Sequence, residues 1–181
     1  MINLFTLIFA PSFLVFIRYF DFKQTVLAYI FLSVLFFIVA YLKKRKAEDF
    51  IVISIYFILL IISYFSSDIK TIKFIPVFTS MVFVIFFIDG AINKKELILK
   101  LTQKFYPKQL SDAEVAYLKN GDYYWAISLF MYMLLLVSTI LYGNNTSWAI
   151  LSSVGWYIYF GVVLTIQILY GKLYAIKMYL K

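Results

Sequence analysis

The chain has 181 residues, of which 64% are apolar and 14% are charged, and its mean hydropathy is +0.91. A water-soluble domain carries about 25% charged residues, so the composition excludes an ordinary soluble domain. The net charge of +8 comes from basic residues dispersed at the boundaries of apolar segments, a pattern that does not favour nucleic-acid binding.

The apolar residues form blocks long enough to cross a membrane as helices. The stretch 51–65 is almost continuously apolar, whereas a transmembrane strand would alternate apolar and polar side chains. A helix also satisfies every backbone amide within its own segment, as lipid requires. We therefore predict an all-α fold, a polytopic transmembrane helical bundle with about five or six spans, forming a single integral membrane domain over residues 1–181.

The spans are expected, in chain order, at about 2–20, 24–42, 50–66, 74–91, 123–142 and 148–170. The first segment contains Pro11 and carries Arg18 near its end, so it either crosses the membrane or forms a re-entrant or interfacial helix. No basic residue precedes this apolar run and no small-residue cleavage site follows it, so no cleavable signal peptide is expected.

The basic residues predict the orientation of the chain. Most of them fall in segments 43–46, 93–121 and 172–181, which the predicted spans place on one side of the membrane. The positive-inside rule makes that side cytoplasmic. The C-terminus is therefore expected in the cytoplasm, and the N-terminus also if the first segment spans. The basic residues on the other side are Arg18, Lys23, Lys70 and Lys73.

The polar connection 92–122 is expected to be a short cytoplasmic amphipathic connector. It begins with a helix that would lie in the membrane interface, with its lysines reaching outward, and that ends at Pro107. The apolar face of this helix is predicted to consist of Leu97, Ile98, Leu101 and Phe105. The connector either docks a partner or only lies against the membrane.

A second short helix is predicted within this connector. Ser111 and Glu114 have the spacing of a capping box, and Asn120 with Gly121 gives a natural end. Asp122 is then placed to cap the fifth span, where its negative charge suits the positive end of the helix dipole.

Catalytic chemistry finds little support in the residue types. The chain has no histidine and no cysteine, which excludes His-based triads, thiolate nucleophiles, disulfides and most zinc or haem sites. Nearly all acidic residues lie at predicted helix ends or in loops, and no phosphate-binding glycine pattern is present. We predict no catalytic residue, no cofactor and no metal site, and hence no enzyme.

Asp89 is the strongest candidate for a functional charge inside a span, because an ionisable group within the membrane is a functional hypothesis by default. It follows Phe86, Phe87 and Ile88 near the cytoplasmic end of the fourth span. The structural interpretation, which we favour, puts it at headgroup level and pairs it with a lysine of the nearby Lys94–Lys95.

Three further polar residues complete the candidate intramembrane or interfacial site. Arg18 and Asp21 are three residues apart and would face each other on a continuing helix. Gln167, like its neighbour Thr165, is placed to form a hydrogen bond across helices. Lysine and arginine side chains are also expected to contact anionic lipid headgroups. These are Lys43, Lys44, Arg45, Lys46, Lys94, Lys95, Lys100 and Lys104.

Two further patterns concern packing. Small residues mark a closely packed face of the sixth span, and tyrosines and tryptophans gather toward span ends, as in an aromatic belt at the membrane interface. The small residues are Ala149, Ser152, Ser153 and Gly155. The aromatic residues include Tyr123, Tyr124, Trp125, Trp148, Trp156, Tyr157, Tyr170 and Tyr174.

The order of these features resembles that of a known family. The chain has an N-terminal apolar segment with Pro11 and the run 16–21, a basic loop after the second span, and Trp125–Ala126 followed by Trp148 and Gly155. This arrangement is similar to that of the intracellular septation protein A family and its related uncharacterised membrane proteins, and the likeness covers almost the whole chain.

The resemblance implies a protein of the bacterial inner membrane with a role in septation or envelope maintenance. We therefore expect a non-enzymatic multi-pass protein that supports cell-envelope integrity through contacts with other inner-membrane envelope or division proteins. The alternative is a small transporter or accessory membrane subunit that handles a lipidic or other small substrate. A transporter would require a polar cavity near the middle of the bilayer.

Overall fold

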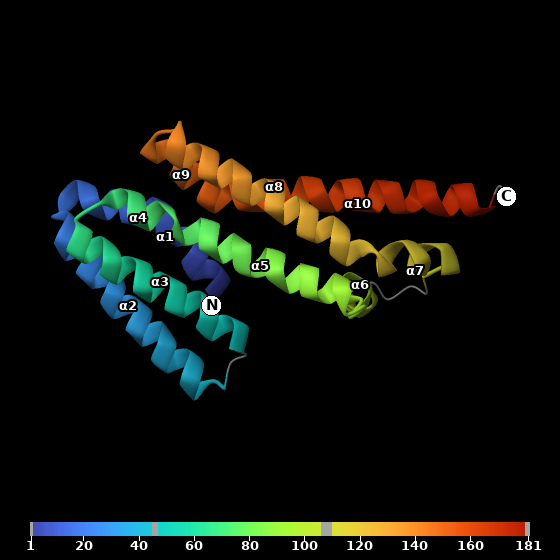
Figure 1. Cartoon of the computed structure of the whole chain (residues 1–181), viewed down its shortest axis with the longest axis horizontal. Helices are drawn as coiled ribbons and strands as arrows, with labels where there is room; N and C mark the ends of the chain where they lie inside the picture. The colour runs from blue at the N-terminus through green and yellow to red at the C-terminus, as the bar shows by residue number, and fades with distance from the viewer. Residues whose placement is uncertain (1, 45–46, 106–109, 180–181) are drawn as a thin grey trace. The chain divides into compact units, whose positions relative to one another are not determined.

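The computed structural model describes residues 2–44, 47–105 and 110–179, and within them the side chains of 2–8, 47–49, 105, 175 and 177–179 lie outside the description. The described residues form helices and no strand (Figure 1). The helices are α1 (Ile2–Tyr19), α2 (Phe22–Leu42), α3 (Ala47–Ser66), α4 (Ile69–Lys73), α5 (Ile75–Ile92), α6 (Leu97–Phe105), α7 (Asp112–Lys119), α8 (Gly121–Leu141), α9 (Asn145–Ile150), the π-helix η1 (Leu151–Gly155) and α10 (Trp156–Tyr179).

Four helical segments of the described chain are long and apolar enough to cross a membrane. They are Phe22–Leu42, Ile69–Ile92, Gly121–Leu141 and Asn145–Tyr174. The first and third predicted spans coincide with α1 and α3, whose described apolar segments, Phe9–Tyr19 and Phe50–Ser66, are shorter. The prediction of an all-α helical membrane bundle is therefore confirmed. Helix α1 also runs without interruption through Pro11.

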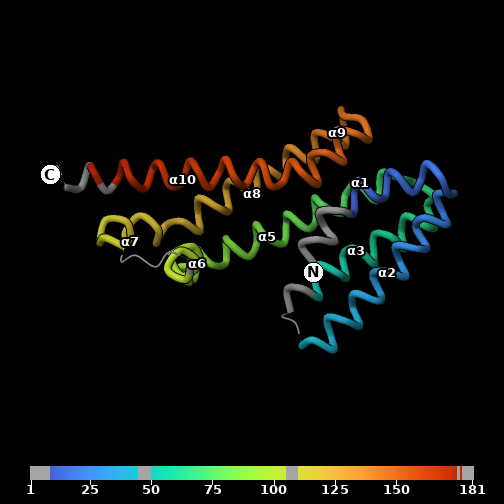
Figure 2. Tube along the Cα trace, turned by 180° about the vertical axis from the view of Figure 1, so that it is seen from behind, coloured from blue at the N-terminus to red at the C-terminus, as the bar shows by residue number. Residues whose placement is uncertain are grey.

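The chain forms two compact units. The first unit contains residues 1–79 and 133–156, and the second contains 80–132 and 157–181. Helices α5 and α8 each contribute residues to both units. Figure 2 traces the chain through these helices, coloured by residue number. The prediction of one integral membrane domain stays a prediction.

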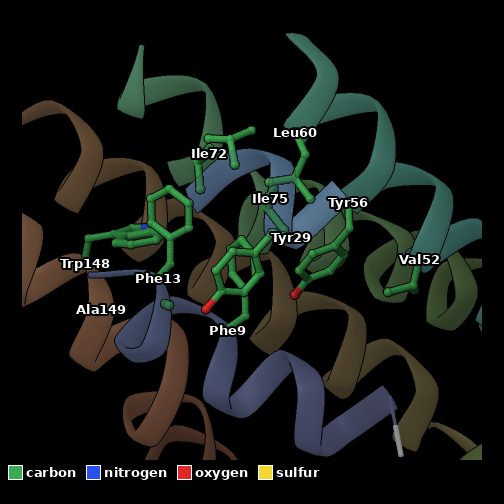
Figure 3. Close-up of a cluster of buried hydrophobic side chains, with 12 residues drawn as sticks. Phe9, Phe13, Tyr29, Val52, Tyr56, Leu60, Ile72, Ile75, Trp148 and Ala149 are labelled. Atoms are coloured by element: carbon green, nitrogen blue, oxygen red, sulfur yellow. The ribbon is translucent and has the colours of Figure 1, made fainter. Parts of the chain in front are cut away.

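The core of the first unit is an aromatic cluster between α1, α2 and α3 (Figure 3). The ring of Phe9 meets Tyr29 edge-on at 5.2 Å between centroids and Tyr56 at 5.0 Å. Such edge-to-face pairs add to the burial of the rings themselves. Tyr29 also shares a hydrogen bond of 2.5 Å with the Ser12 hydroxyl, which ties α2 to α1.

Trp148 completes this core from α9. Its side chain is fully buried, and its indole N–H donates to the backbone carbonyl of Lys73 over 3.1 Å. The prediction that Trp148 belongs to an interfacial aromatic belt is therefore wrong. The physical reason is that the indole N–H finds its acceptor inside the protein, so the ring does not need the membrane surface to satisfy it.

Two of the four small residues that the sequence predicts to pack closely in the sixth span are buried, and Ser152 and Gly155 are half-buried. Ala149 and Ser153 are buried, and α9 and η1 both lie against α1. The sequence did not predict the π-helix. Its wider turn releases backbone carbonyls, and the hydroxyls of Ser152 and Ser153 donate to the carbonyls of Trp148 and Ala149 over 2.7 and 2.5 Å. These bonds give the backbone carbonyls a donor at the point where the α-helix changes to a π-helix.

The second unit contains the connector helices. The short helix predicted after Pro107 is confirmed as α7, and Ser111 and Glu114 form the predicted capping box. The face predicted for α6 is only partly right: Ile98 is buried together with Leu99, whereas Leu101 is 52% exposed. Helix α6 packs against α7 through its Ile98 side, so the Leu101 side is left outward. Phe105 lies outside the described side chains.

The capping box makes the stability of α7 depend on pH. Backbone and side-chain hydrogen bonds from Ser111, of 2.8 and 2.9 Å, hold the pKa of Glu114 below its usual value. A carboxyl whose pKa is lower in the folded state stabilises the fold above its unfolded pKa of about 4.3 and loses that contribution as the pH falls through the folded pKa.

We predict that Glu114→Gln removes this pH dependence, because glutamine keeps an acceptor for Ser111 but does not titrate. Unfolding free energies measured between about pH 3 and pH 7 should show the wild-type advantage, of about 0.5–1 kcal/mol, at neutral pH only. Asp112→Asn, an exposed position in the same helical turn, should leave the pH dependence in place. Parallel curves for the wild type and Glu114→Gln would contradict the prediction.

Candidate functional site

The second unit holds a set of buried polar side chains that we call the buried polar cluster, made of Asp122, Trp125 and Gln167. Their exposed fractions are 1%, 7% and 4%. Asp122 and Trp125 lie in the first turns of α8, and Gln167 lies on α10. The sequence places these residues in apolar helices, so each polar atom needs a partner within the protein.

Asp122 holds the N-terminus of α6. Its two carboxylate oxygens accept hydrogen bonds from the backbone N–H groups of Leu97, at 3.0 Å, and Ile98, at 2.9 Å. The first N–H groups of a helix have no partner within the helix, and their partial positive charge suits a carboxylate. The prediction that the Asp122 side chain caps α8 is therefore corrected: it lies in the first turn of α8 and caps α6 instead.

Gly90 allows this approach. A Cβ atom at Gly90 would lie 2.5 Å from Cδ1 of Leu97 and 3.0 Å from Oδ2 of Asp122. A side chain there would force the Leu97 side chain to move and would crowd the Asp122 carboxylate. The last turns of α5, the start of α6 and the start of α8 thus meet at one point within the second unit.

Trp125 and Gln167 join α8 to α10. The Trp125 indole N–H donates to Oε1 of Gln167 over 2.7 Å. Tyr124 reinforces the same pairing, since its hydroxyl donates to the backbone carbonyl of Val163 over 2.9 Å. The hydroxyl of Tyr117 on α7 donates to the carbonyl of Gln167 itself over 3.2 Å. Three helices of the second unit are therefore linked at Gln167.

The interhelical hydrogen bond predicted for Gln167 is thus present, whereas Thr165 does not form one. The Thr165 hydroxyl is exposed and donates to the carbonyl of Gly161 in its own helix. Trp125, like Trp148, is buried, so the prediction of an interfacial belt is wrong for both residues. Tyr123, Tyr157, Tyr170 and Tyr174 are exposed.

One polar atom of the cluster has no partner within the described residues. Nε2 of Gln167 is buried and makes no hydrogen bond. The Trp125 donor fixes the orientation of the amide, because a donor requires the oxygen on its side. Nε2 is therefore directed toward Gly121, where a Cβ atom would lie 3.1 Å from it. A buried donor without an acceptor is a rare and costly arrangement.

Asp89 lies near the end of α5, outside this cluster, and is half-buried. Its carboxylate accepts from Nζ of Lys95 at 2.5 Å and from Nδ2 of Asn93 at 2.6 Å. This is the lysine pairing that the structural interpretation of Asp89 expects. The charge of Asp89 therefore closes the corner between α5 and α6.

The structure does not bring Arg18 and Asp21 together. Helix α1 ends at Tyr19 and α2 begins at Phe22, so the continuing helix on which the two would face each other does not exist. Both side chains are exposed, and no ion pair forms between them among the described residues. The four candidate residues Arg18, Asp21, Asp89 and Gln167 thus do not form one common site.

The lysines expected to contact lipid headgroups are exposed where they are described. They include Lys43 and Lys44 after α2, while Arg45 and Lys46 lie outside the described residues. Around α6 the exposed lysines are Lys94, Lys95, Lys100 and Lys104. Lys95 pairs with Asp89, and Nζ of Lys100 donates to the Lys95 carbonyl over 2.6 Å.

The sequence reasoning missed two features of these helices. It did not join Asp122 to α6, since the residues bonded to it lie 24 and 25 positions earlier in the chain. It also treated Lys73 as a loop residue, whereas Lys73 is the last residue of α4 and only 7% exposed. The apolar neighbours Ile72 and Ile75 were the available signal.

No group of three or more acidic side chains that could hold a metal ion is found in the part of the chain that the structure describes. Comparison with protein-family models, with curated proteins and with solved structures finds no match.

We predict that Asp122→Asn destabilises the protein by about 1–3 kcal/mol, because the amide nitrogen would face a backbone N–H of α6 and leave it unpaired in a buried position. Unfolding in mixed micelles, followed by circular dichroism, measures this change. Asp21→Asn is the matched control, since Asp21 is the residue that precedes α2 but its side chain makes no capping bond. Equal losses for the two variants would rule out the role of Asp122.

We also predict an energetic coupling between Trp125 and Gln167. A double-mutant cycle with Trp125→Phe and Gln167→Leu should give about 0.6–1.7 kcal/mol, the scale of interhelical hydrogen bonds in membrane proteins. Ser138→Ala combined with Gln167→Leu serves as the control pair, because the Ser138 hydroxyl bonds within its own helix. Additive effects of Trp125→Phe and Gln167→Leu would show that the bond carries no stability.

Proposed function

We propose that this chain is a non-enzymatic multi-pass protein of the bacterial inner membrane, with its C-terminus in the cytoplasm. In this proposal it supports cell-envelope integrity or septation through contacts with other envelope or division proteins of that membrane. The observation that carries the non-enzymatic part is the use of its acidic side chains in building the helices.

Most of the described acidic side chains hold helix ends or corners. Asp68 accepts from the Lys70 N–H at the start of α4, and Glu114 closes the capping box of α7. Asp89 pairs with Lys95, and Glu96 lies 3.8 Å from Nζ of Lys119. Together with Asp122, these carboxylates are committed to structure, which supports a protein whose output is an interaction and not a reaction.

The helix surfaces support the second part of the proposal. Large apolar side chains are exposed along the long helices, such as Ile127 and Met131 on α8 and Ile158 and Val162 on α10. In a membrane these faces meet either lipid or the helices of other proteins. The envelope role itself rests on the resemblance of the sequence to the septation family.

The test combines deletion with site-specific crosslinking. A photo-crosslinking residue at Ile127 or Ile158, which are 64% and 63% exposed, should capture division or wall-synthesis membrane proteins in growing cells. The same residue at Leu129, which is 1% exposed on α8, is the matched control and should capture none. Cells that lack the protein should divide abnormally or become sensitive to osmotic stress. Normal envelopes together with no captured protein would overturn the proposal.

The unpaired amide of Gln167 supports a second candidate, a small transporter or accessory subunit for a lipidic or other small substrate. A buried donor without an acceptor is a group that a bound polar molecule could satisfy. Under this alternative, cells that lack the protein accumulate or lose a lipid species while the envelope proteins are unaffected. Gln167→Leu should reproduce that lipid change and Thr165→Val, on the same helix, should not.

A further inference from the structure

Two charged side chains are buried in the described chain, Asp122 and Lys73, and only Asp122 has partners for its charged group within the protein. The Asp122 carboxylate is satisfied within the protein, since it accepts two backbone N–H groups of α6. Lys73 has no hydrogen-bond acceptor and no ion-pair partner for its ammonium among the described residues. A buried lysine without a partner is unfavourable, and an anion from outside these residues would stabilise its charge.

The position of Lys73 is fixed by its surroundings in the first unit. Ile72 and Ile75 on either side are fully buried, and the Lys73 carbonyl accepts the indole N–H of Trp148. The backbone at Lys73 is therefore held beside the aromatic cluster. Lys73 still keeps 7% of its surface exposed, so a molecule outside the protein can reach it.

The nearby acidic residues do not neutralise Lys73. Asp68, at the start of the same short helix, directs Oδ1 to the backbone N–H of Lys70 over 2.8 Å. Asp21, at the corner between α1 and α2, is exposed. Lys23 at this end lies over the ring of Tyr64, at 5.8 Å from its centroid. Basic side chains therefore outnumber acidic ones around the two corners of the first unit.

The location of Lys73 identifies the kind of anion. It lies four residues into the candidate span Ile69–Ile92, close to where the hydrocarbon layer begins. Phospholipid phosphates are the abundant anions at that depth, and lysines with buried stems reach toward them. We propose that Lys73 binds the phosphate of an anionic phospholipid, which thereby becomes a structural partner of the first unit.

The experiment measures lipid retention by the purified full-length chain. Native mass spectrometry in mild detergent would compare the retention of phosphatidylglycerol with that of phosphatidylcholine. We expect the wild type to prefer phosphatidylglycerol by about fivefold, the scale expected of one basic residue near an anionic surface. Lys73→Met should abolish this preference. Lys70→Met, an exposed lysine three residues earlier on the same helix, should keep it.

Two further measurements distinguish a bound lipid from misfolding and from the binding of free phosphate. Lys73→Arg should fold and keep the preference for phosphatidylglycerol. Lys73→Met should have the same circular dichroism spectrum as the wild type, so that its loss of preference is assigned to the missing charge and not to misfolding. Millimolar inorganic phosphate should not displace the lipid. An unchanged preference in Lys73→Met, or complete displacement by inorganic phosphate, would overturn the proposal. Neither result depends on the cellular role proposed above.

Discussion

The apolar surroundings of the long helices impose one constraint on this protein: each buried polar group must find a partner without bulk water. The Asp122 carboxylate is the clearest response to that constraint. It neutralises the exposed amide end of α6 and at the same time attaches that helix to the start of α8. A buried carboxylate would be unfavourable on its own, but here its two hydrogen bonds to α6 compensate for the burial and attach α6 to α8.

Tryptophan serves the same purpose in both units. In the first unit Trp148 donates its indole N–H to a backbone carbonyl, and in the second Trp125 donates to the side chain of Gln167. Each ring contributes a large buried apolar surface, and its one polar atom is satisfied by another helix. Helices in lipid gain little from hydrophobic burial against each other. Their association therefore depends more on such hydrogen bonds and on close packing.

The structural use of the charged side chains bears on function. The charges that could have formed a reactive centre are distributed among caps, corners and ion pairs, which favours a protein that acts through its surfaces. Nε2 of Gln167 has no partner among the described residues, and neither does the Lys73 ammonium. Each of these two groups could bind a molecule that the protein meets in the membrane, and lipid is the most abundant such molecule.

The sequence by itself determined the all-α membrane class, the boundaries of the first five long helices to within about three residues and the capping box of α7. These depend on local composition and on spacings of three or four residues, which a single segment contains. Only the tertiary structure decided which side chains are buried together. Asp122 meets α6, and Trp125 meets Gln167, across 24 and 42 positions of sequence. When a helix is apolar on all sides, the periodicity of its sequence does not show which face is buried. The hydrogen-bond partners across helices, the burial of the two tryptophans and the burial of Lys73 are therefore decided by packing alone.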